Sequence, residues 1–182
     1  MPTILTHVLV GSAIGLTTIS KKKPVRFWML SAFCAAWPDI DSLGFALGVK
    51  YGGLLGHRGL SHSLLFAAVL SALVVLLFFR KVEFRRQWPR LLVYFFLVTA
   101  SHDVFDALTT GGLGVAFFAP FDSTRYFFPW RRIMAAPVQP AAFFGQWGWE
   151  ALSSEFVWVW LPTAAIVGVV LASRSLVRRL RR

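Results

Sequence analysis

The side chains of this sequence best suited to chemistry are its four histidines and half of its eight acidic residues. They stand close to the ends of apolar segments, and imidazole and carboxylate groups are costly in hydrocarbon unless they pair or bind a cation. Counting about 1.5 Å per helical residue places them at a common depth, roughly 18–26 Å from the far ends of their segments. The pattern predicts a metal site that draws on the following residues: His7, Asp39, Asp41, His57, His62, His102, Asp103 and Asp106.

Two pairs of these residues have informative spacing. His102 and Asp106 are four residues apart, so they are neighbours on one face of a helix and can share a metal ion. Asp103 is rotated by about 100° from His102, which leaves open whether it faces the same centre. Asp39 and Asp41 would point the same way in an extended stretch, where one could ligate an ion while the other bridges a second ion or orients an imidazole. The alternative for this pair is a Pro-Asp turn with solvated acids.

A short polar stretch before the third apolar segment brings His57 and His62 together with Arg58. Neutral imidazole is a common ligand of divalent metals, and the guanidinium of Arg58 suits a phosphate oxygen. Ser61 or Ser63 is expected to cap the helix that follows. The stretch therefore predicts metal ligands beside a group that binds phosphate.

The number of ligand-type residues indicates the class of reaction. Four histidines and up to four aspartates exceed what one catalytic zinc with three protein ligands needs, so one to three ions are expected. Such clusters generate hydroxide near neutral pH and hold the attacking and leaving oxygens of phosphoryl transfer. The sequence contains neither a Gly-x-Ser-x-Gly esterase elbow nor a Walker-type phosphate loop. Metal-assisted hydrolysis is the reaction class that these residues favour.

Helices that cross a membrane are the elements expected to position these residues. The chain has 182 residues, of which 57% are hydrophobic and eight are tryptophan, a composition with too little polar surface for a soluble globule. We predict an all-α integral membrane bundle that forms a single domain, 1–182. Its five expected spans are about 4–20, 25–37, 60–79, 90–110 and 156–173.

The basic residues predict how the bundle is oriented in the membrane. With five spans, the clusters at 21–26, 80–90 and 174–182 all fall on one side, which the positive-inside rule places in the cytoplasm. The N-terminus and the loops 38–59 and 111–155 then lie outside, so the site faces the extracytoplasmic side of the inner membrane. Anionic lipid headgroups account for the net charge of +11, and no nucleic acid is expected. The sequence does not determine an oligomeric state.

The 111–155 loop is rich in glycine, proline, aromatic residues and arginine. Aromatic residues with arginine at an interface form a belt at the level of the lipid headgroups. The alternative is a lid or re-entrant loop over the site, in which Arg125 meets a substrate phosphate. Part of the loop, 138–150, is apolar enough to dip into the membrane.

The motifs of the site resemble those of a known family, the YdjM-like membrane-bound metal-dependent hydrolases. The resemblance covers residues 6 to about 112, and the His-Arg-Gly-x-Ser/Thr-His-Ser block at 57–63 is its most specific part. The family's Pro-Asp-x-Asp is often followed by His, where this chain has Ser42. The family is similar, distantly, to zinc-dependent phospholipase C and P1 nuclease, helical enzymes that use several zinc ions. By that resemblance the ligands would be His7, Asp39, Asp41, His57, His62, His102 and Asp106.

We therefore expect a membrane-embedded metal-dependent hydrolase, with zinc as the expected ion and manganese as the alternative. Its substrate would be a phosphate ester or diphosphate of a lipid or lipid-linked carrier at the outer leaflet. Arg58, Asp103 and Arg125 are the candidate catalytic residues beside the metal ligands. One alternative is a metal-ion or proton transporter, although the inner halves of the spans contain almost no ionisable residues. Another is a metal-free phosphohistidine lipid phosphatase, although its Lys-x6-Arg-Pro signature is absent.

Overall fold

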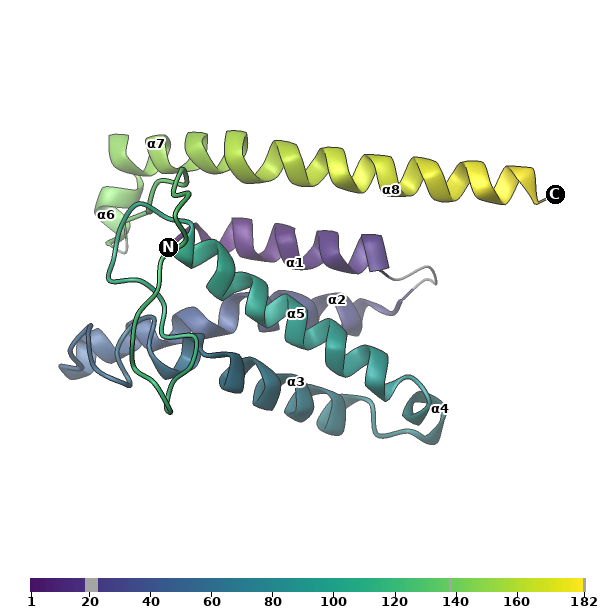
Figure 1. Ribbon diagram of the computed structural model, residues 1–182, viewed down its shortest axis with the longest axis horizontal. Coiled ribbons are helices and arrows are strands. Elements are labelled where there is room, and N and C mark those ends of the chain that lie inside the picture. The colour runs from purple at the N-terminus through teal and green to yellow at the C-terminus, as the bar shows by residue number, and fades with distance from the viewer. Residues whose placement is uncertain (19–22, 138, 182) are drawn as a thin grey trace.

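The protein is helical throughout its regular structure in the computed structural model, which describes residues 1–18, 23–137 and 139–181 (Figure 1). The α-helices are α1 (Ile4–Thr18), α2 (Val25–Ala36), α3 (Leu64–Phe78), α4 (Val82–Arg85), α5 (Trp88–Ala107), α6 (Pro140–Phe143), α7 (Gln146–Glu155) and α8 (Leu161–Leu180). Two 3₁₀ helices, η1 (Trp37–Leu47) and η2 (Leu60–His62), and a π turn, η3 (Phe156–Trp160), complete the order. Within the described ranges, strand pairing is limited to two isolated bridges, Thr109 with Ile133 and Val115 with Tyr126.

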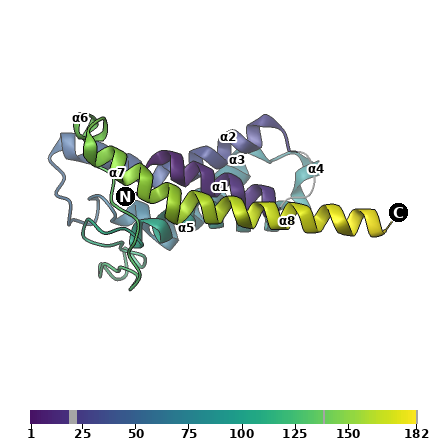
Figure 2. The same cartoon turned by 90° about the horizontal axis from the view of Figure 1, so that it is seen from above.

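The long helices run along one axis, and α5 packs against α1, α2 and α3 (Figure 1). The N-terminus, α6 and the loops 48–59 and 108–137 lie at one end, the loop end. The short helix α4 and the C-terminus lie at the other, the basic end. Helix α8 lies against α1 and extends past the other helices at the basic end (Figure 2). Up-and-down connectivity therefore brings 37–63, 108–137 and the start of α1 to the same end.

The core of the bundle explains why these helices pack so closely. Buried apolar side chains of α2, α3 and α5, among them Phe27, Val75 and Phe95, form one continuous cluster. Gly15 lets α1 approach its neighbours, because a Cβ atom there would lie within 3.0 Å of the Trp28 ring and of the Tyr94 hydroxyl. The packing fixes α1 and α5 relative to each other, and these two helices carry site residues.

A buried carboxylate, that of Glu155 at the end of α7, binds the start of α1. Glu155 accepts hydrogen bonds from the backbone N–H of Thr3 (2.6 Å), from the Thr3 hydroxyl (2.6 Å) and from the Thr6 hydroxyl (2.5 Å). Trp160 donates its indole N–H to the Thr6 hydroxyl at 2.6 Å. At the other end of α1, Arg174 donates to the carbonyl oxygens of Leu16 and Thr17. Helix α1 is thus held at both ends by α7, η3 and α8.

The structure confirms the all-helical class, and the bounds of the helices differ in part from the predicted spans. One helix, 146–180, is long and apolar enough to cross a membrane by length and composition, whereas α1 and α3 are shorter apolar helices. Residues 146–155 were predicted as part of a loop, but they form α7, which continues through the π turn into α8. Residues 19 and 20 of the first predicted span, and 21 and 22 of the basic cluster, lie outside the described residues. The five-span bundle stays a prediction.

Candidate metal centre

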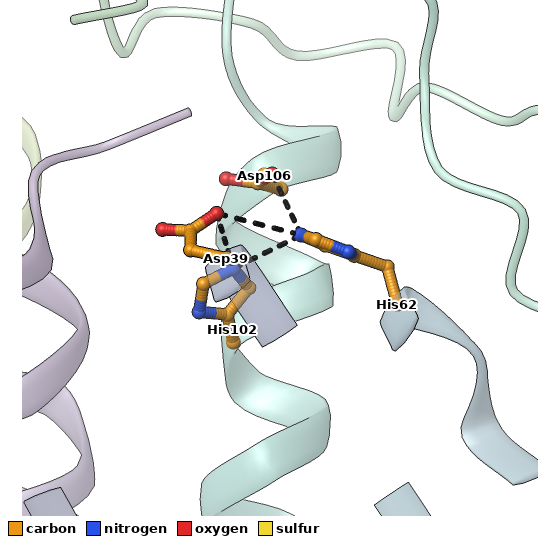
Figure 3. A group of neighbouring side chains, drawn as sticks. All are labelled: Asp39, His62, His102 and Asp106. Carbon is orange, nitrogen blue, oxygen red and sulfur yellow. Dashed lines mark hydrogen bonds and ion pairs between the residues drawn. The ribbon is translucent and has the colours of Figure 1, made fainter. Parts of the chain in front are cut away.

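Four elements bring the candidate ligands together at the loop end. Helix α1 carries His7, η1 carries Asp39, η2 carries His62, and the last turns of α5 carry His102 and Asp106. The side chains of the last four point toward one another (Figure 3). Each of the five residues is buried, with at most 5% of its surface exposed.

Asp39, His62, His102 and Asp106 form a group, here called the four-residue cluster, that could hold a metal ion. The Nε2 atoms of His62 and His102 are 3.2 Å apart. Asp39 Oδ1 lies 3.3 Å from His102 Nε2 and 3.6 Å from His62 Nε2, and Asp106 Oδ2 lies 3.6 Å from His62 Nε2. One ligand atom from each residue lies within 4.8 Å of all the others.

Hydrogen bonds on the far side of each ring determine how the two histidines face the cluster. His102 Nδ1 lies 2.8 Å from the Ala35 carbonyl oxygen, which can only accept, so Nδ1 carries a proton. His62 Nδ1 lies 3.0 Å from Asp41 Oδ2. When both rings are neutral, as metal binding requires, these contacts place the ring proton on Nδ1, and both Nε2 lone pairs point into the four-residue cluster.

Several polar atoms around the cluster have no hydrogen-bond partner among the described residues. They are both ring nitrogens of His7 and both carboxylate oxygens of Asp39, Asp103 and Asp106. The His7 ring stacks on His102 with 3.6 Å between centroids, and its Nε2 lies 3.7 Å from Asp106 Oδ1. Asp103 is fully buried, but it is not a member of the group that could hold an ion. Its catalytic role stays a prediction.

Arg58 is fully buried and forms an ion pair with Asp106, with Nε 2.8 Å from Oδ2. Its other nitrogens donate to the Gly111 carbonyl (2.8 Å) and to the Thr109 hydroxyl (3.0 Å). Its backbone has a φ of 62°, an uncommon left-handed conformation for a residue other than glycine. Gly112, with a φ of 86°, leaves room for the guanidinium, because a Cβ atom there would lie 2.7 Å from it. In this structure Arg58 therefore contacts Asp106 and the 109–111 loop.

Asp41, His57 and His62 form a second group whose ligand atoms lie within 4.8 Å of one another. Unlike Asp39, Asp41 accepts hydrogen bonds from His57 Nδ1 (2.7 Å), Ser61 Oγ (2.5 Å) and Arg58 N (3.2 Å), and its Oδ2 forms an ion-pair contact with His62 Nδ1 at 3.0 Å. Burial opposes ionisation of Asp41, but the bonds from the two imidazoles outweigh it and hold the pKa of this carboxyl below its usual range.

The conformation of 37–47 corrects one expectation about the two acids of this segment. They were considered as alternate residues of an extended stretch, but η1 is a 3₁₀ helix, in which successive residues are rotated by about 120°. Asp39 consequently faces Nε2 of His62, and Asp41 faces Nδ1 of the same ring. Ser63 caps α3, as predicted, by accepting from Phe66 N at 3.0 Å.

Arg125 lies apart from the four-residue cluster and binds the backbone of the loops. Its guanidinium donates to five carbonyl oxygens, those of Tyr51, Gly53, His57, Arg58 and Gly114. These hydrogen bonds link residues 51–58 to Gly114 through Arg125. In this structure the Arg125 side chain therefore stabilises the loops. Its predicted contact with phosphate is not tested by this arrangement.

Comparison with known proteins agrees with the sequence patterns. Residues 1–177 match the family model described as YdjM inner membrane protein. A curated relative, the inner membrane protein YbcI of Escherichia coli (strain K12), is 38% identical over 170 residues, which are 93% of this chain and 97% of that protein. No solved structure matches the chain.

Proposed function

The chain belongs to the YdjM family of inner membrane proteins, and we propose that it is a metal-dependent hydrolase with a divalent ion, zinc, in the four-residue cluster. The observation that carries the proposal is the convergence of two imidazoles and two carboxylates, all buried, with one ligand atom from each within 4.8 Å of the others and no hydrogen-bond partner for either carboxylate among the described residues. The expected substrate is a phosphate ester or diphosphate of a lipid or lipid-linked carrier.

The convergence is unfavourable without a cation. With both Nε2 atoms deprotonated, two imidazole lone pairs and two carboxylates repel one another across about 3–4 Å, and burial strengthens that repulsion. A buried acceptor left without a partner costs about 1–3 kcal/mol, and more when it is charged. A divalent cation at the centre would satisfy every one of these atoms. The fit to a cation is therefore chemical as well as geometric.

The spacing of the ligand atoms suits zinc. Zinc bonds of about 2.0–2.1 Å in a tetrahedral site separate the ligand atoms by about 3.3–3.4 Å. Four of the six separations between ligand atoms of the cluster are 3.2, 3.3, 3.6 and 3.6 Å, and one ligand atom from each residue lies within 4.8 Å of all the others. Two imidazoles favour zinc over manganese, which prefers six oxygen-rich ligands. Asp39, His62, His102 and Asp106 would hold the ion.

If the protein is a hydrolase, the residues around the ion would have distinct roles. A zinc ion held there would neutralise charge on phosphate, and it would supply hydroxide near neutral pH once one of the four side chains leaves a position open to water, because a catalytic zinc keeps three protein ligands and a water. Arg58 orients Asp106 and balances its charge through the ion pair at 2.8 Å. Asp103, whose oxygens have no partner among the described residues, is the candidate acceptor or donor of a proton. Because the cluster is buried, a substrate would enter when the 109–112 loop, which Arg58 holds, moves aside.

The membrane arrangement is part of the same proposal. Helices α1, α2, α3, α5 and α8 would be the five spans, with the basic end in the cytoplasm among anionic headgroups. The four-residue cluster, at the opposite end, would then face the extracytoplasmic leaflet, where lipid-linked phosphates present their headgroups.

Ion transport is the rival function, and the core argues against it. A transported ion needs a polar path to the far end of the bundle. Between the four-residue cluster and the basic end, apolar side chains of α2, α3 and α5 pack together, among them Phe27, Leu70, Val74, Phe95 and Val98. This packing favours an ion that stays at the centre.

The proposal is tested by metal analysis of purified protein together with a hydrolysis assay. Wild type should contain about one zinc per chain, and Asp39→Asn and His102→Gln should contain none. Asp122→Asn, an exposed acid outside the cluster, is the matched control. Wild type reconstituted with zinc should release phosphate or a phosphorylated headgroup from one member of a panel of phospholipids and polyprenyl phosphates. Protein that stays metal-free after incubation with zinc and manganese would overturn the proposal, and turnover that survives chelation would favour a phosphohistidine mechanism.

A further inference from the structure

The two aspartates of the Pro-Asp-Ile-Asp segment have different environments, although they are two residues apart. Asp39 faces the four-residue cluster, and neither of its oxygens has a hydrogen-bond partner among the described residues. Asp41 accepts three hydrogen bonds from the segment that precedes α3, and its Oδ2 also lies 3.0 Å from His62 Nδ1. We infer that Asp41 is a positioning residue, which holds His62 with Nε2 toward the ion, and is not itself a ligand. The inference rests on the proposed metal binding.

The contacts at His62 define the orientation of its ring. Asp41 Oδ2 lies 3.0 Å from Nδ1, on the side of the ring opposite the cluster. Ser61 donates its hydroxyl proton to Asp41 and lies 3.1 Å from Nδ1, where its oxygen can accept. Both neighbours of Nδ1 are thus acceptors, which places the ring proton on Nδ1 and leaves the Nε2 lone pair for the ion. A carboxylate behind a metal-binding imidazole is a common way to fix the tautomer.

The same contacts argue against a second ion between Asp41, His57 and His62. Such an ion would require lone pairs at Nδ1 of both imidazoles, the atoms that now donate to Asp41. His62 would have to lose both ring protons, since its Nε2 already faces the four-residue cluster. The bonds from Ser61 Oγ and Arg58 N already occupy Asp41 Oδ2. The group holds one ion through His62, and Asp41 acts behind it.

Cobalt substitution separates a ligand from a positioning residue, because the visible absorption of Co²⁺ reports its coordination. Wild type should bind one Co²⁺ per chain. Asp41→Asn should bind one Co²⁺ with the same spectrum and about 10–100-fold lower affinity, the usual effect of removing a carboxylate behind a ligand. Asp39→Asn should lose the ion or change the spectrum. Asp122→Asn should match wild type in both measurements.

The imidazole nitrogen signals of metal-free protein provide a second readout. With ¹⁵N-labelled histidine, His62 should show a proton on Nδ1 in wild type and a shift toward the other tautomer in Asp41→Asn, because an amide N–H can face that nitrogen. Two ions in wild type, of which Asp41→Asn loses one, would overturn the inference and leave the metal proposal intact. A neutral wild-type His62 whose only ring proton is on Nε2 would also overturn it. Failure of wild type to bind any ion would overturn the proposed function itself.

Discussion

Glu155 and the aspartates of the four-residue cluster are buried carboxylates near the same end of α1, but their surroundings differ. Glu155 accepts three hydrogen bonds from Thr3 and Thr6. Asp39 receives none from the described residues, and Asp106 has an ion pair with Arg58 while both of its oxygens lack a hydrogen bond. Burial of a carboxylate is therefore not a sign of a metal site. The sign is a convergence of imidazole and carboxylate groups in which the carboxylates lack hydrogen-bond partners among the described residues.

Helix α1 connects the two regions. Its first turns place Thr3 and Thr6 against Glu155, and the next residue, His7, stacks on His102 beside the cluster. Glu155 therefore acts as part of the scaffold, while the aspartates depend on an added ion. The two kinds of carboxylate should respond differently to metal removal and to loss of charge.

Chelation should have the largest effect and should act through the four-residue cluster alone. An ion at about a thousand times its dissociation constant stabilises the folded state by about 4 kcal/mol. Removing it from wild type with a chelator should lower the unfolding temperature in detergent correspondingly. Asp39→Asn, which binds no ion under the proposal, should show no such shift. An equal shift in wild type and Asp39→Asn would place the stabilising ion elsewhere.

Glu155→Gln should have the next largest effect, and it should not depend on metal. The amide retains one acceptor, but it replaces a charged acceptor of three short hydrogen bonds, each worth about 1.5–3 kcal/mol when one partner is charged. We expect a loss of about 2–4 kcal/mol in thermal unfolding, equal with and without chelator. The exposed acid of the same helix, Glu150, provides the control, since Glu150→Gln should change stability by less than about 0.5 kcal/mol. A loss confined to metal-loaded protein would place Glu155 in the centre.

The sequence identified the cluster because its spacing rules are local. His102 and Asp106 share a helical face at four residues' separation, and the structure brings both to the four-residue cluster. Polar side chains at the ends of apolar helices also had to meet at one end of an up-and-down bundle. The predicted YdjM-like family is confirmed by the match of residues 1–177 to the family model and by the relative that is 38% identical.

The remaining features depend on contacts that no local pattern reveals. Glu155 was not predicted as a functional or structural residue, because its partners lie 149 and 152 residues earlier in the chain. The opposite directions of Asp39 and Asp41 follow from the 3₁₀ conformation of η1, which short-range propensity does not specify. Helix α7 was assigned to a loop because its glycine and polar residues interrupt the apolar pattern of 156–173.

His7 offers the finest test, because it lies between the two regions and was predicted to be a ligand. Its Nε2 is 3.7 Å from Asp106 Oδ1, yet His7 is not a member of the four-residue cluster, and its ring stacks on the His102 ring. His7→Phe preserves stacking and removes both nitrogens. We expect one ion per chain with an affinity no more than about tenfold lower, or about 1.4 kcal/mol, in competition with a chelator.

A larger fall, or loss of the ion, would make His7 a fifth ligand and extend the metal centre onto α1. The first turns of α1 would then both bind Glu155 and supply a metal ligand. In that case Glu155→Gln should lower metal affinity as well as stability. If His7→Phe keeps the ion, the same double measurement on Glu155→Gln should show reduced stability with metal affinity changed by less than about threefold. Measuring stability and metal affinity on His7→Phe and on Glu155→Gln therefore decides whether the contacts of Glu155 and the metal centre are independent. Only a ligand role for His7 would couple them.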